Sequence, residues 1–354
     1  MKQKIRVMVV DDSIVFRSWL VQSLGDDPRF EVVGYAVNAL DAKNKLPILK
    51  PDIMTLDIEM PGMSGLEFLK EILPIHPVPV ILVSSLNVRV FDALAAGAVD
   101  FVRKPGMENG AKEAFLITLK AKLSIGANAR VRLPSIQTST PLSISTRQTT
   151  ASLKQSHMSA GFKSNVDLIA IGASTGGTEA ILEVVKQFPA KMPGIVITQH
   201  MPAGFTSMYA ERLNRLCKLE VKEARHGDKV QPGLVLLAPG GLQMRVVRLG
   251  AGYSVSCTDE AKVSGHKPSV DVLFDSVASN VRNKAIGVIL TGMGADGAAG
   301  MLRMRKSGAY TIGQDRESCV VYGMPMEAYK IGAVCQQAAL TAIPQTVLAH
   351  LAKA

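Results

Sequence analysis

The sequence lacks a long apolar run. Nowhere in its 354 residues do about 18 uncharged apolar residues follow one another, the length that a membrane-spanning helix needs. Asp11 and Asp12 interrupt the first apolar run after only a few residues. We therefore expect neither a signal peptide nor a membrane span. With 47% hydrophobic and 20% charged residues, the composition is typical of a globular, soluble protein.

Cysteine is scarce, and no two cysteines form a C-x-x-C pair. The four are scattered through the second half of the chain, at Cys217, Cys257, Cys319 and Cys335. Structural zinc sites and disulfide frameworks require regular, close cysteine spacings, so this pattern argues against both. The sequence predicts a protein of the reducing cytoplasm.

Acidic residues are absent between Ala114 and Val166. This stretch carries seven of the positive charges behind the net charge of +10, at Lys120, Lys122, Arg130, Arg132, Arg147, Lys154 and Lys163. Residues 134–160 contain seven serines and five threonines, and their apolar residues follow no steady period. Such a segment cannot bury enough surface to fold, so we expect a linker. Because the charge lies largely there, we expect no nucleic-acid partner.

The linker divides the chain into two globular parts. We assign residues 1–125 to the first, 126–163 to the linker and 164–354 to the second. Short Val/Ile/Leu-rich runs alternate with helical patterns in both, which predicts α/β folds with parallel sheets: a doubly wound, flavodoxin-like first domain and a Rossmann-like, three-layer α/β/α second domain. The expected strands are IRVMVV, EVVGYA, IMTL, PVILVS and DFVR, then VDLIAI, GIVITQ, LVLLAP, YSVSC, AIGVIL and AYTIG.

Polar residues in the first part follow the expected strands at their carboxyl ends. They are Asp11, Asp12, Asp57, Ser84 and Lys104. Parallel strands bring these ends to one edge, where three crowded carboxylates repel one another unless a cation lies among them. Oxygen ligands with open water positions suit Mg²⁺. One carboxylate could then attack phosphorus while the cation, the hydroxyl and the lysine neutralise the phosphoryl oxygens.

The motifs VVDDS, LDIEMPGMSGLEFL and DFVRKP resemble a response-regulator receiver domain in order and spacing. The resemblance implies that Asp57 is the phosphoacceptor and that Asp11 and Asp12 complete the Mg²⁺ site. It also implies that Ser84 and Lys104 sense the phosphoryl group and that Phe101 is the aromatic switch residue.

Near the start of the second part is the loop IGASTGG, which lies between an expected strand and an expected helix. No lysine follows Gly177, so the loop is not a Walker A motif, and its glycines lack the dinucleotide-binding spacing. The loop does satisfy G-x-S-x-G, with Ser174 at the turn. This pattern favours a nucleophilic serine over a phosphate cradle.

A serine nucleophile needs a base and an orienting acid. His200 ends the strand GIVITQ, and Asp296 follows the strand AIGVIL inside a glycine-rich turn, so both could reach the same sheet edge as Ser174. His266 is a rival base. With Asp228 or Asp259 it would give the Ser, Asp, His order of α/β-hydrolases acting on small esters.

Six motifs in the second part resemble the catalytic domain of the chemotaxis protein-glutamate methylesterase family: IGASTGG, QHMPAGFTSMYAERLN, LAPGG, HKPSVDVLFDSVA, LTGMGADGAAGM and VVYGMPMEA. The resemblance implies that Ser174 is the nucleophile, His200 the base, Asp296 its orienting acid and the Met293 backbone N–H an oxyanion donor. Gln243 departs from the histidine often found after APGG. The departure leaves the role of that position open.

The resemblance also implies a function. We expect phosphorylation-activated hydrolysis of glutamyl methyl esters on chemoreceptors, and deamidation of receptor glutamines, for chemotactic adaptation. The expected partners are chemoreceptor cytoplasmic domains as substrate and a chemotaxis histidine kinase as phosphoryl donor, with Mg²⁺ for phosphorylation, no cofactor for the esterase and a monomeric state. The alternatives are the small-ester hydrolase and a receiver-linked DNA-binding regulator.

Overall fold

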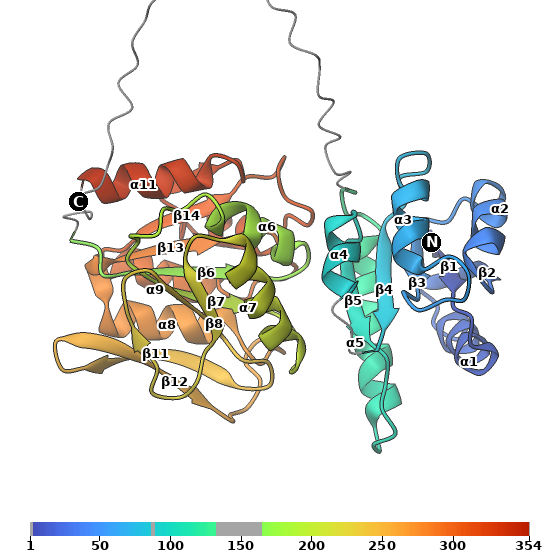
Figure 1. Cartoon of the computed structure of the whole chain (residues 1–354), viewed down its shortest axis with the longest axis horizontal. Helices are drawn as coiled ribbons and strands as arrows, with labels where there is room; N and C mark the ends of the chain where they lie inside the picture. Colours follow the sequence, from blue (N-terminus) through green and yellow to red (C-terminus); the bar gives the residue numbers. More distant parts are fainter. Residues whose placement is uncertain (1–2, 86–88, 132–164, 354) are drawn as a thin grey trace, which may run out of the picture.

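A computed structural model describes residues 3–85, 89–131 and 165–353 (Figure 1). Most of the expected linker, from residue 132 to 164, lies outside the described residues. The structure contains two α/β units, which are joined in sequence through that segment. Among the described helices, none is both long and apolar enough to cross a membrane.

The first unit is a parallel five-stranded sheet in the order β2-β1-β3-β4-β5. Its strands are β1 (Ile5–Val10), β2 (Phe30–Ala36), β3 (Ile53–Leu56), β4 (Val80–Ser84) and β5 (Asp100–Arg103). Its helices are α1 (Ile14–Gly25), α2 (Ala39–Leu49), α3 (Gly65–Ile72), α4 (Arg89–Ala95) and α5 (Ala111–Gly126). All five strands agree with the predicted runs to within a residue. The strand order confirms the doubly wound fold, in which the chain reverses direction across the sheet between β1 and β3.

Side-chain caps fix where several of these helices begin. Ser64 accepts from the backbone of Glu67, whose carboxylate accepts from the Ser64 backbone, so the two form a capping box at α3. Asn38 caps α2 by accepting from the Asp41 backbone N–H. Because both caps precede apolar helical patterns in the sequence, they are local signals for the helix boundaries.

The second unit is a parallel seven-stranded sheet in the order β15-β14-β13-β6-β7-β10-β8. Its strands are β6 (Leu168–Ala173), β7 (Gly194–Gln199), β8 (Glu220–Glu223), β10 (Leu234–Leu237), β13 (Ala285–Ile289), β14 (Tyr310–Gln314) and β15 (Gln336–Ala338). Its helices are α6 (Gly177–Val185), α7 (Phe205–Leu216), α8 (Val270–Asn280), η1 (Arg282–Lys284), α9 (Ala298–Lys306), α10 (Met324–Lys330) and α11 (Ile343–Lys353).

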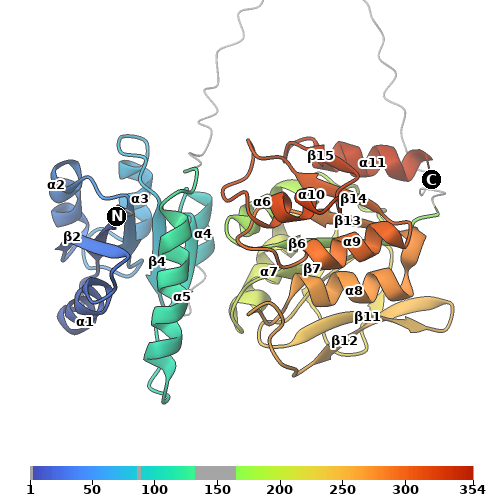
Figure 2. The ribbon, with the colours of Figure 1, turned by 180° about the vertical axis from the view of Figure 1, so that it is seen from behind.

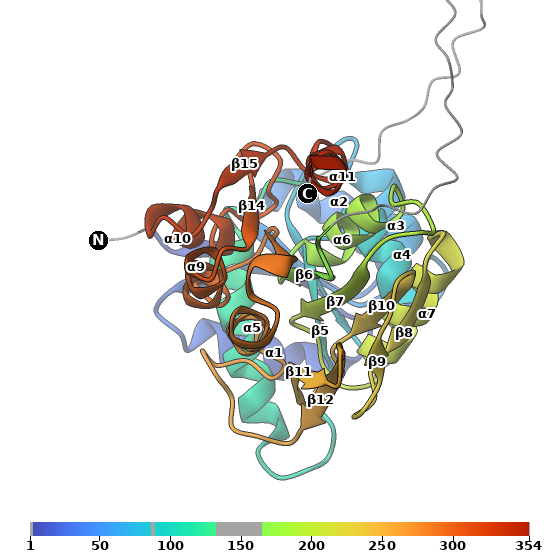
Figure 3. The ribbon, with the colours of Figure 1, turned by 90° about the vertical axis from the view of Figure 1, so that its left-hand side faces the viewer.

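Helices cover both faces of this sheet, as the uniformly apolar strands predict. Ile169 and Ile171 of β6 belong to the core beneath α6, α7 and α11, whereas Leu168 and Ala170 belong to the core beneath α8 and α9. Figures 2 and 3 show the strands between these two helical layers. The three-layer α/β/α prediction is confirmed.

One expected strand lies elsewhere. The run YSVSC forms part of β12 (Gly252–Thr258), which pairs antiparallel with β11 (Gln243–Leu249) and β9 (Lys229–Val230) in a separate three-stranded sheet. Placing it in the parallel sheet was wrong. Alternation in β12 resembles that of any half-buried strand, and the turn at Gly250 that makes the hairpin was not recognised as a signal. This hairpin packs against α8 and so borders the site described below.

Candidate functional site

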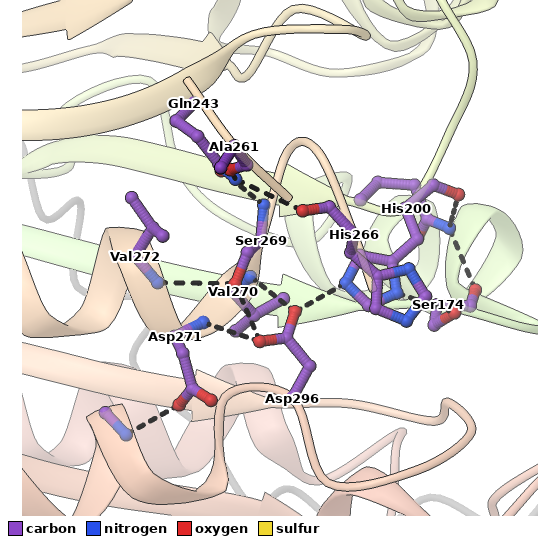
Figure 4. Close-up of polar contacts among 12 residues, drawn as sticks. Ser174, His200, Gln243, Ala261, His266, Ser269, Val270, Asp271, Val272 and Asp296 are labelled. Atoms are coloured by element: carbon purple, nitrogen blue, oxygen red, sulfur yellow. Dashed lines mark hydrogen bonds and ion pairs between the residues drawn. The ribbon is translucent and has the colours of Figure 1, made fainter. Parts of the chain in front are cut away.

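Ser174, His200 and Asp296 come together at the carboxyl edge of the seven-stranded sheet. The strand order reverses at β6, which has β7 on one side and β13 on the other. Ser174 follows β6, His200 follows β7 and Asp296 follows β13. Such a reversal opens a crevice beyond the strand ends, and residues that are far apart in the sequence meet there. Figure 4 shows the three side chains facing one another.

The glycines of IGASTGG shape the turn that presents Ser174. Gly176 has a φ of +75°, in the left-handed region that side chains rarely adopt. At Gly177, the first residue of α6, an added Cβ would lie 2.1 Å from the Gln199 side-chain oxygen. These two positions need glycine, because one requires a left-handed backbone and the other a close approach to β7. The turn leaves the hydroxyl of Ser174 in a cleft near the helix amino terminus.

His200 joins the serine to the carboxylate. Its Nδ1 lies 3.0 Å from Ser174 Oγ, and its Nε2 lies 2.7 Å from Asp296 Oδ2. An ionised carboxylate can only accept, so Nε2 carries the proton and Nδ1 is free to accept from the hydroxyl. The two ring nitrogens have the opposite partners from those in the familiar serine-protease arrangement, but the chemical relationship of base to acid is the same.

Asp296 is held as a carboxylate by several donors. Ser269 Oγ donates to it at 2.7 Å, Val270 N at 2.7 Å and Asp271 N at 3.1 Å. Burial alone would raise the pKa of this carboxyl, but the hydrogen bonds from His200, Ser269 and Val270 lower the pKa from 3.8 to about 2. The group is therefore ionised at neutral pH, as an orienting acid must be.

His266 lies against His200 without taking its place. The two rings are stacked, and only the His200 ring forms hydrogen bonds to Ser174 and Asp296. Asp228 pairs with Lys222 and Asp259 pairs with Lys267, and no contact with His266 is found for either acid within the described ranges. The geometry therefore does not assemble the alternative base with either of its proposed acids.

The Met293 backbone lies beside the serine. A Cβ on Gly292 would come within 2.8 Å of Ser174 Cβ, so this loop packs directly against the nucleophile turn. Ser174 N donates to Thr291 O at 3.0 Å, which ties the two loops together. The Met293 side chain is 36% exposed at the mouth of the cleft. Met293 thus lines the same cleft as Ser174, and its role as an oxyanion donor stays a prediction.

Two supporting residues were missed by the sequence reasoning, and the role of a third, Gln243, was left open. Gln199 donates from Nε2 to Ser174 O at 2.9 Å and to His200 O at 3.3 Å. Ser269 caps α8 as well as donating to Asp296, and Gln243 contacts Ser269 N. Ser269 had a usable signal, since a serine directly before an apolar helical pattern is a typical cap. Gln199 had none, and Gln243 had only its departure from the family pattern, because their bonds go to backbone groups that only the fold brings near.

The first unit has its own cluster of carboxylates. Ligand oxygens of Asp11, Asp12 and Asp57 lie within 4.8 Å of one another, at the point where the order reverses between β1 and β3. Lys104 Nζ lies 2.6 Å from Asp57 Oδ2 and 2.9 Å from Asp11 Oδ2. Burial raises the pKa of Asp57 above 3.8, although the Lys104 hydrogen bond and charge oppose this shift. The cluster can hold a hard divalent cation.

Ser84 and Phe101, the two other residues predicted to respond to phosphorylation, lie in different surroundings. Ser84 Oγ is buried and has no hydrogen-bond partner among the described residues, so it is available to a phosphoryl oxygen. Phe101 does not lie against the carboxylates. Its ring packs on Phe205 of α7, with centroids 4.6 Å apart. The predicted switch residue is thus a contact between the two units.

The receiver-like unit forms one wall of the cleft at Ser174. Phe101 and Lys122 line that wall, and Ser174, His200 and His266 line the opposite one. Asp100 accepts a hydrogen bond from Thr175 Oγ1 at 2.5 Å and pairs with Lys122 at 2.6 Å. Further contacts join Phe91 to Tyr209 and Arg130 to the backbone of Glu317 and Val320.

Comparison with known proteins agrees with this arrangement. Residues 169–347 match the model of the CheB methylesterase family, and residues 7–115 match that of the response regulator receiver domain. The chain is 50% identical to a protein-glutamate methylesterase/protein-glutamine glutaminase of Syntrophomonas wolfei, over 98% of this chain and 97% of the relative.

A relative of the same name from Syntrophotalea carbinolica is also 50% identical, over 94% of this chain and 93% of the relative. The crystal structure of the Thermotoga maritima CheB methylesterase catalytic domain is 34% identical, has a TM-score of 0.51 and covers 52% of this chain and 98% of its own. The chain therefore belongs to the CheB methylesterase family and carries a response regulator receiver domain in front of the methylesterase domain.

Proposed function

We propose that this protein hydrolyses glutamyl methyl esters on chemoreceptors, with Ser174 as nucleophile, His200 as base and Asp296 as its orienting acid. The supporting observation is the unbroken chain of contacts from Ser174 Oγ through both His200 nitrogens to Asp296, at 3.0 and 2.7 Å. A serine hydroxyl is a weak nucleophile unless a positioned base takes its proton. These contacts supply the base and fix the orientation of its ring.

In the reaction, Ser174 Oγ attacks the γ-carbonyl carbon as its proton passes to His200 Nδ1. Met293 N–H donates to the developing oxyanion, a type of contact that lowers the barrier by about 3 to 4 kcal/mol. The C–O bond to the methoxy group then breaks, and His200 returns the proton so that methanol leaves. Water hydrolyses the acyl-serine by the same base, which releases glutamate.

The same route would deamidate glutamine, with ammonia as the leaving group. The names of the relatives carry both activities, protein-glutamate methylesterase and protein-glutamine glutaminase. A γ-carboxamide presents its carbonyl carbon at the same distance from the main chain as a γ-methyl ester. One serine, one base and one oxyanion donor therefore suffice for both substrates.

Regulation would operate through the cleft wall contributed by the receiver domain. A receptor helix is too bulky to reach Ser174 while Phe101 and Lys122 lie across from it. A histidine kinase would transfer a phosphoryl group to Asp57, and Lys104 and Ser84 would then turn toward its oxygens. Asp100 and Phe101 belong to β5, the strand that precedes Lys104. They also contact Thr175 and Phe205 of the catalytic domain. Movement of β5 would release the catalytic edge.

A Mg²⁺ ion would be held by the carboxylates of Asp11, Asp12 and Asp57. Their oxygens fit the preference of the ion for hard ligands, and three mutually repelling carboxylates in a space of 4.8 Å favour a cation. When bound, the ion would neutralise phosphoryl oxygens during transfer to Asp57. The ester hydrolysis requires no such group in the route above.

The decisive measurement is methanol release from methylated receptor membranes by the full chain, with and without a small phosphodonor and Mg²⁺. We expect release that the phosphodonor stimulates, loss of release in Ser174→Ala, and loss of stimulation alone in Asp57→Asn. A folded Ser174→Ala protein that releases methanol at the wild-type rate would exclude the proposed nucleophile. Cytoplasmic location and a monomeric state remain predictions.

A further inference from the structure

His200 has two supports besides the serine that it activates. Asp296 accepts from the edge of its ring at 2.7 Å, and His266 covers the face of the ring at a centroid distance of 3.6 Å. The first contact sets the direction in which Nδ1 points, and the second restricts rotation of the ring out of its plane. Both supports must be placed correctly for Nδ1 to face Ser174 Oγ.

The position of Asp296 depends on the start of α8. Among the described residues, the donors to Asp296 besides His200 come from that helix start: Ser269 Oγ, Val270 N and Asp271 N. The position of His266 depends on the segment just before the helix. The positions of Asp296 and His266 therefore both depend on residues 261–271.

One buried side chain holds this segment at three points. Gln243 is the first residue of β11 and is 0% exposed. Its Nε2 donates to Ala261 O and to His266 O, each at 3.1 Å, and its Oε1 accepts from Ser269 N at 2.9 Å (Figure 4). A single amide thus joins the segment that carries His266 to the helix start that holds Asp296.

The chemistry of the amide suits this role. Glutamine offers two donors and an acceptor on one rigid plane, which matches two carbonyl groups and one N–H. A neutral histidine, which the family resemblance leads one to expect here, offers only one donor and one acceptor and could satisfy two of the three groups. The glutamine therefore satisfies one more of these backbone groups than a histidine could.

We propose that Gln243 is a positioning residue for ester hydrolysis, which keeps His266 and Asp296 in place around His200. The proposal rests on the function proposed above. Gln243 touches none of the reacting atoms, so it acts only through the two supports of the base. Its loss should therefore weaken the chemical step rather than the binding of the receptor.

Two variants of the full chain test this, measured with phosphodonor and Mg²⁺ so that the cleft is open. Gln243→Met has a similar length and cannot form any of the three hydrogen bonds. Gln243→Asn keeps the amide but withdraws it by one methylene. Because small displacements in an active site can cost about 100-fold in rate, we expect kcat for methanol release to fall about 10- to 100-fold in Gln243→Met and about 10-fold in Gln243→Asn. KM should stay within about twofold, because the groups that face the receptor are unchanged.

Asn280→Ala is the matched control. Asn280 donates to Val246 O and Ser276 O, so it joins the same strand β11 to the same helix α8, but at the end away from Asp296. Its loss removes two comparable hydrogen bonds to backbone carbonyls. We expect a lowered melting temperature with kcat close to wild type. If Gln243 had a merely structural role, its variants and Asn280→Ala would have the same kcat.

The outcomes separate the two proposals. Wild-type kcat in either folded Gln243 variant would overturn the positioning role. So would a fall in the kcat of Asn280→Ala that equals the fall in a Gln243 variant of the same melting temperature. If Gln243→Met does not fold, Gln243→Asn decides. Ser174→Ala in the same assay tests the underlying function: if it retains activity, the triad has failed, whereas its inactivity beside fully active Gln243 variants rejects only the inference about Gln243.

Discussion

The imidazole rings of His200 and His266 are stacked, with centroids 3.6 Å apart and planes within 9° of parallel. A positive charge on either ring disfavours a positive charge on the other. Burial of His266, the nearby His200, and the charges of Lys122 and Lys262 lower the pKa of His266 from 6.5 to about 4, against the opposing effect of Asp296. His266 is therefore neutral at physiological pH, and the neighbouring ring of His200 stays the proposed acceptor of the Ser174 proton.

This shift predicts a pH dependence of stability. Below pH 6.5 the unfolded chain takes up a proton at His266 that the folded chain does not take up until about pH 4. Stability is thus lost as the pH falls from 6.5 toward 4, at about 1.4 kcal/mol per unit. His266→Phe keeps an aromatic ring that does not titrate. We expect the wild type to lose stability relative to this variant across that window, measured by denaturant unfolding of the full chain at several pH values.

Titrating groups away from this site affect both proteins alike, so the difference between the two free energies reports the stacked pair of His266 and His200. A difference that stays constant from pH 6.5 to pH 4 would show that the side chain is protonated in the folded state as readily as in the unfolded one.

Ser269 is expected to matter for both stability and turnover. It caps α8 by accepting from Val272 N, and it donates to Asp296 at 2.7 Å. Replacing a cap with alanine costs about 1 kcal/mol, and loss of the donor leaves Asp296 less firmly placed. We predict that Ser269→Ala lowers the free energy of unfolding by about 1 to 2 kcal/mol and kcat for methanol release by about 10-fold.

Asn38→Ala provides the comparison, because Asn38 caps α2 of the receiver domain and no contact with the catalytic site is found for it in the described parts of the chain. Its stability loss should be similar and its phosphodonor-stimulated kcat unchanged. Equal kcat values in Ser269→Ala and Asn38→Ala would show that Ser269 acts only as a helix cap and does not position Asp296.

Local patterns determined the parts of this structure that the sequence could predict. The strands GIVITQ and DFVR were correct to the residue because both are short apolar runs bounded by polar residues. The geometric relation of Ser174, His200 and Asp296 was also predictable, since parallel strands bring their carboxyl ends to one edge. The choice of His200 over His266 as the base depended on the family resemblance, because its position at a strand end gave His200 only a modest preference.

The remaining features are products of packing between distant segments. The contact of Asp100 with Thr175 joins residues 75 positions apart in different domains. Gln243 bonds to backbone groups of a loop and a helix that follow it by 18 to 26 residues. Neither kind of contact has a periodicity or a motif. The strand YSVSC was misplaced for the same reason, since its partner strand, not its own sequence, decides to which sheet it belongs.

Weakening the contact between the domains should raise the resting activity. Asp100 accepts from Thr175 Oγ1, next to the proposed nucleophile, and pairs with Lys122. A hydrogen bond to a charged group contributes about 1.5 to 3 kcal/mol, and part of this holds the receiver over the cleft. We predict that Asp100→Ala raises unstimulated methanol release several-fold, up to about 10-fold, and leaves the fully stimulated rate near wild type.

Asp41→Ala is the control, since Asp41 pairs with Lys45 within α2 and has no contact with the catalytic domain among those described. It should leave both rates unchanged. An unstimulated rate in Asp100→Ala that matches wild type would mean that this hydrogen bond does not contribute to closure.

Chelation of divalent cations should affect the phosphorylation of the receiver domain but not the ester hydrolysis of the catalytic domain. Asp11, Asp12 and Asp57 form the one cluster suited to a metal ion that is found among the described residues, and it lies in the receiver domain. Without a cation, the three carboxylates repel an incoming phosphoryl group, so phosphorylation of Asp57 stops. The proposed chemistry at Ser174 uses only hydrogen-bonded side chains and backbone N–H groups. We therefore expect EDTA to abolish stimulation by the phosphodonor, to leave the unstimulated rate of methanol release unchanged, and to have no effect on Asp57→Asn. A parallel fall of the stimulated and unstimulated rates would place a required metal ion in the esterase reaction itself.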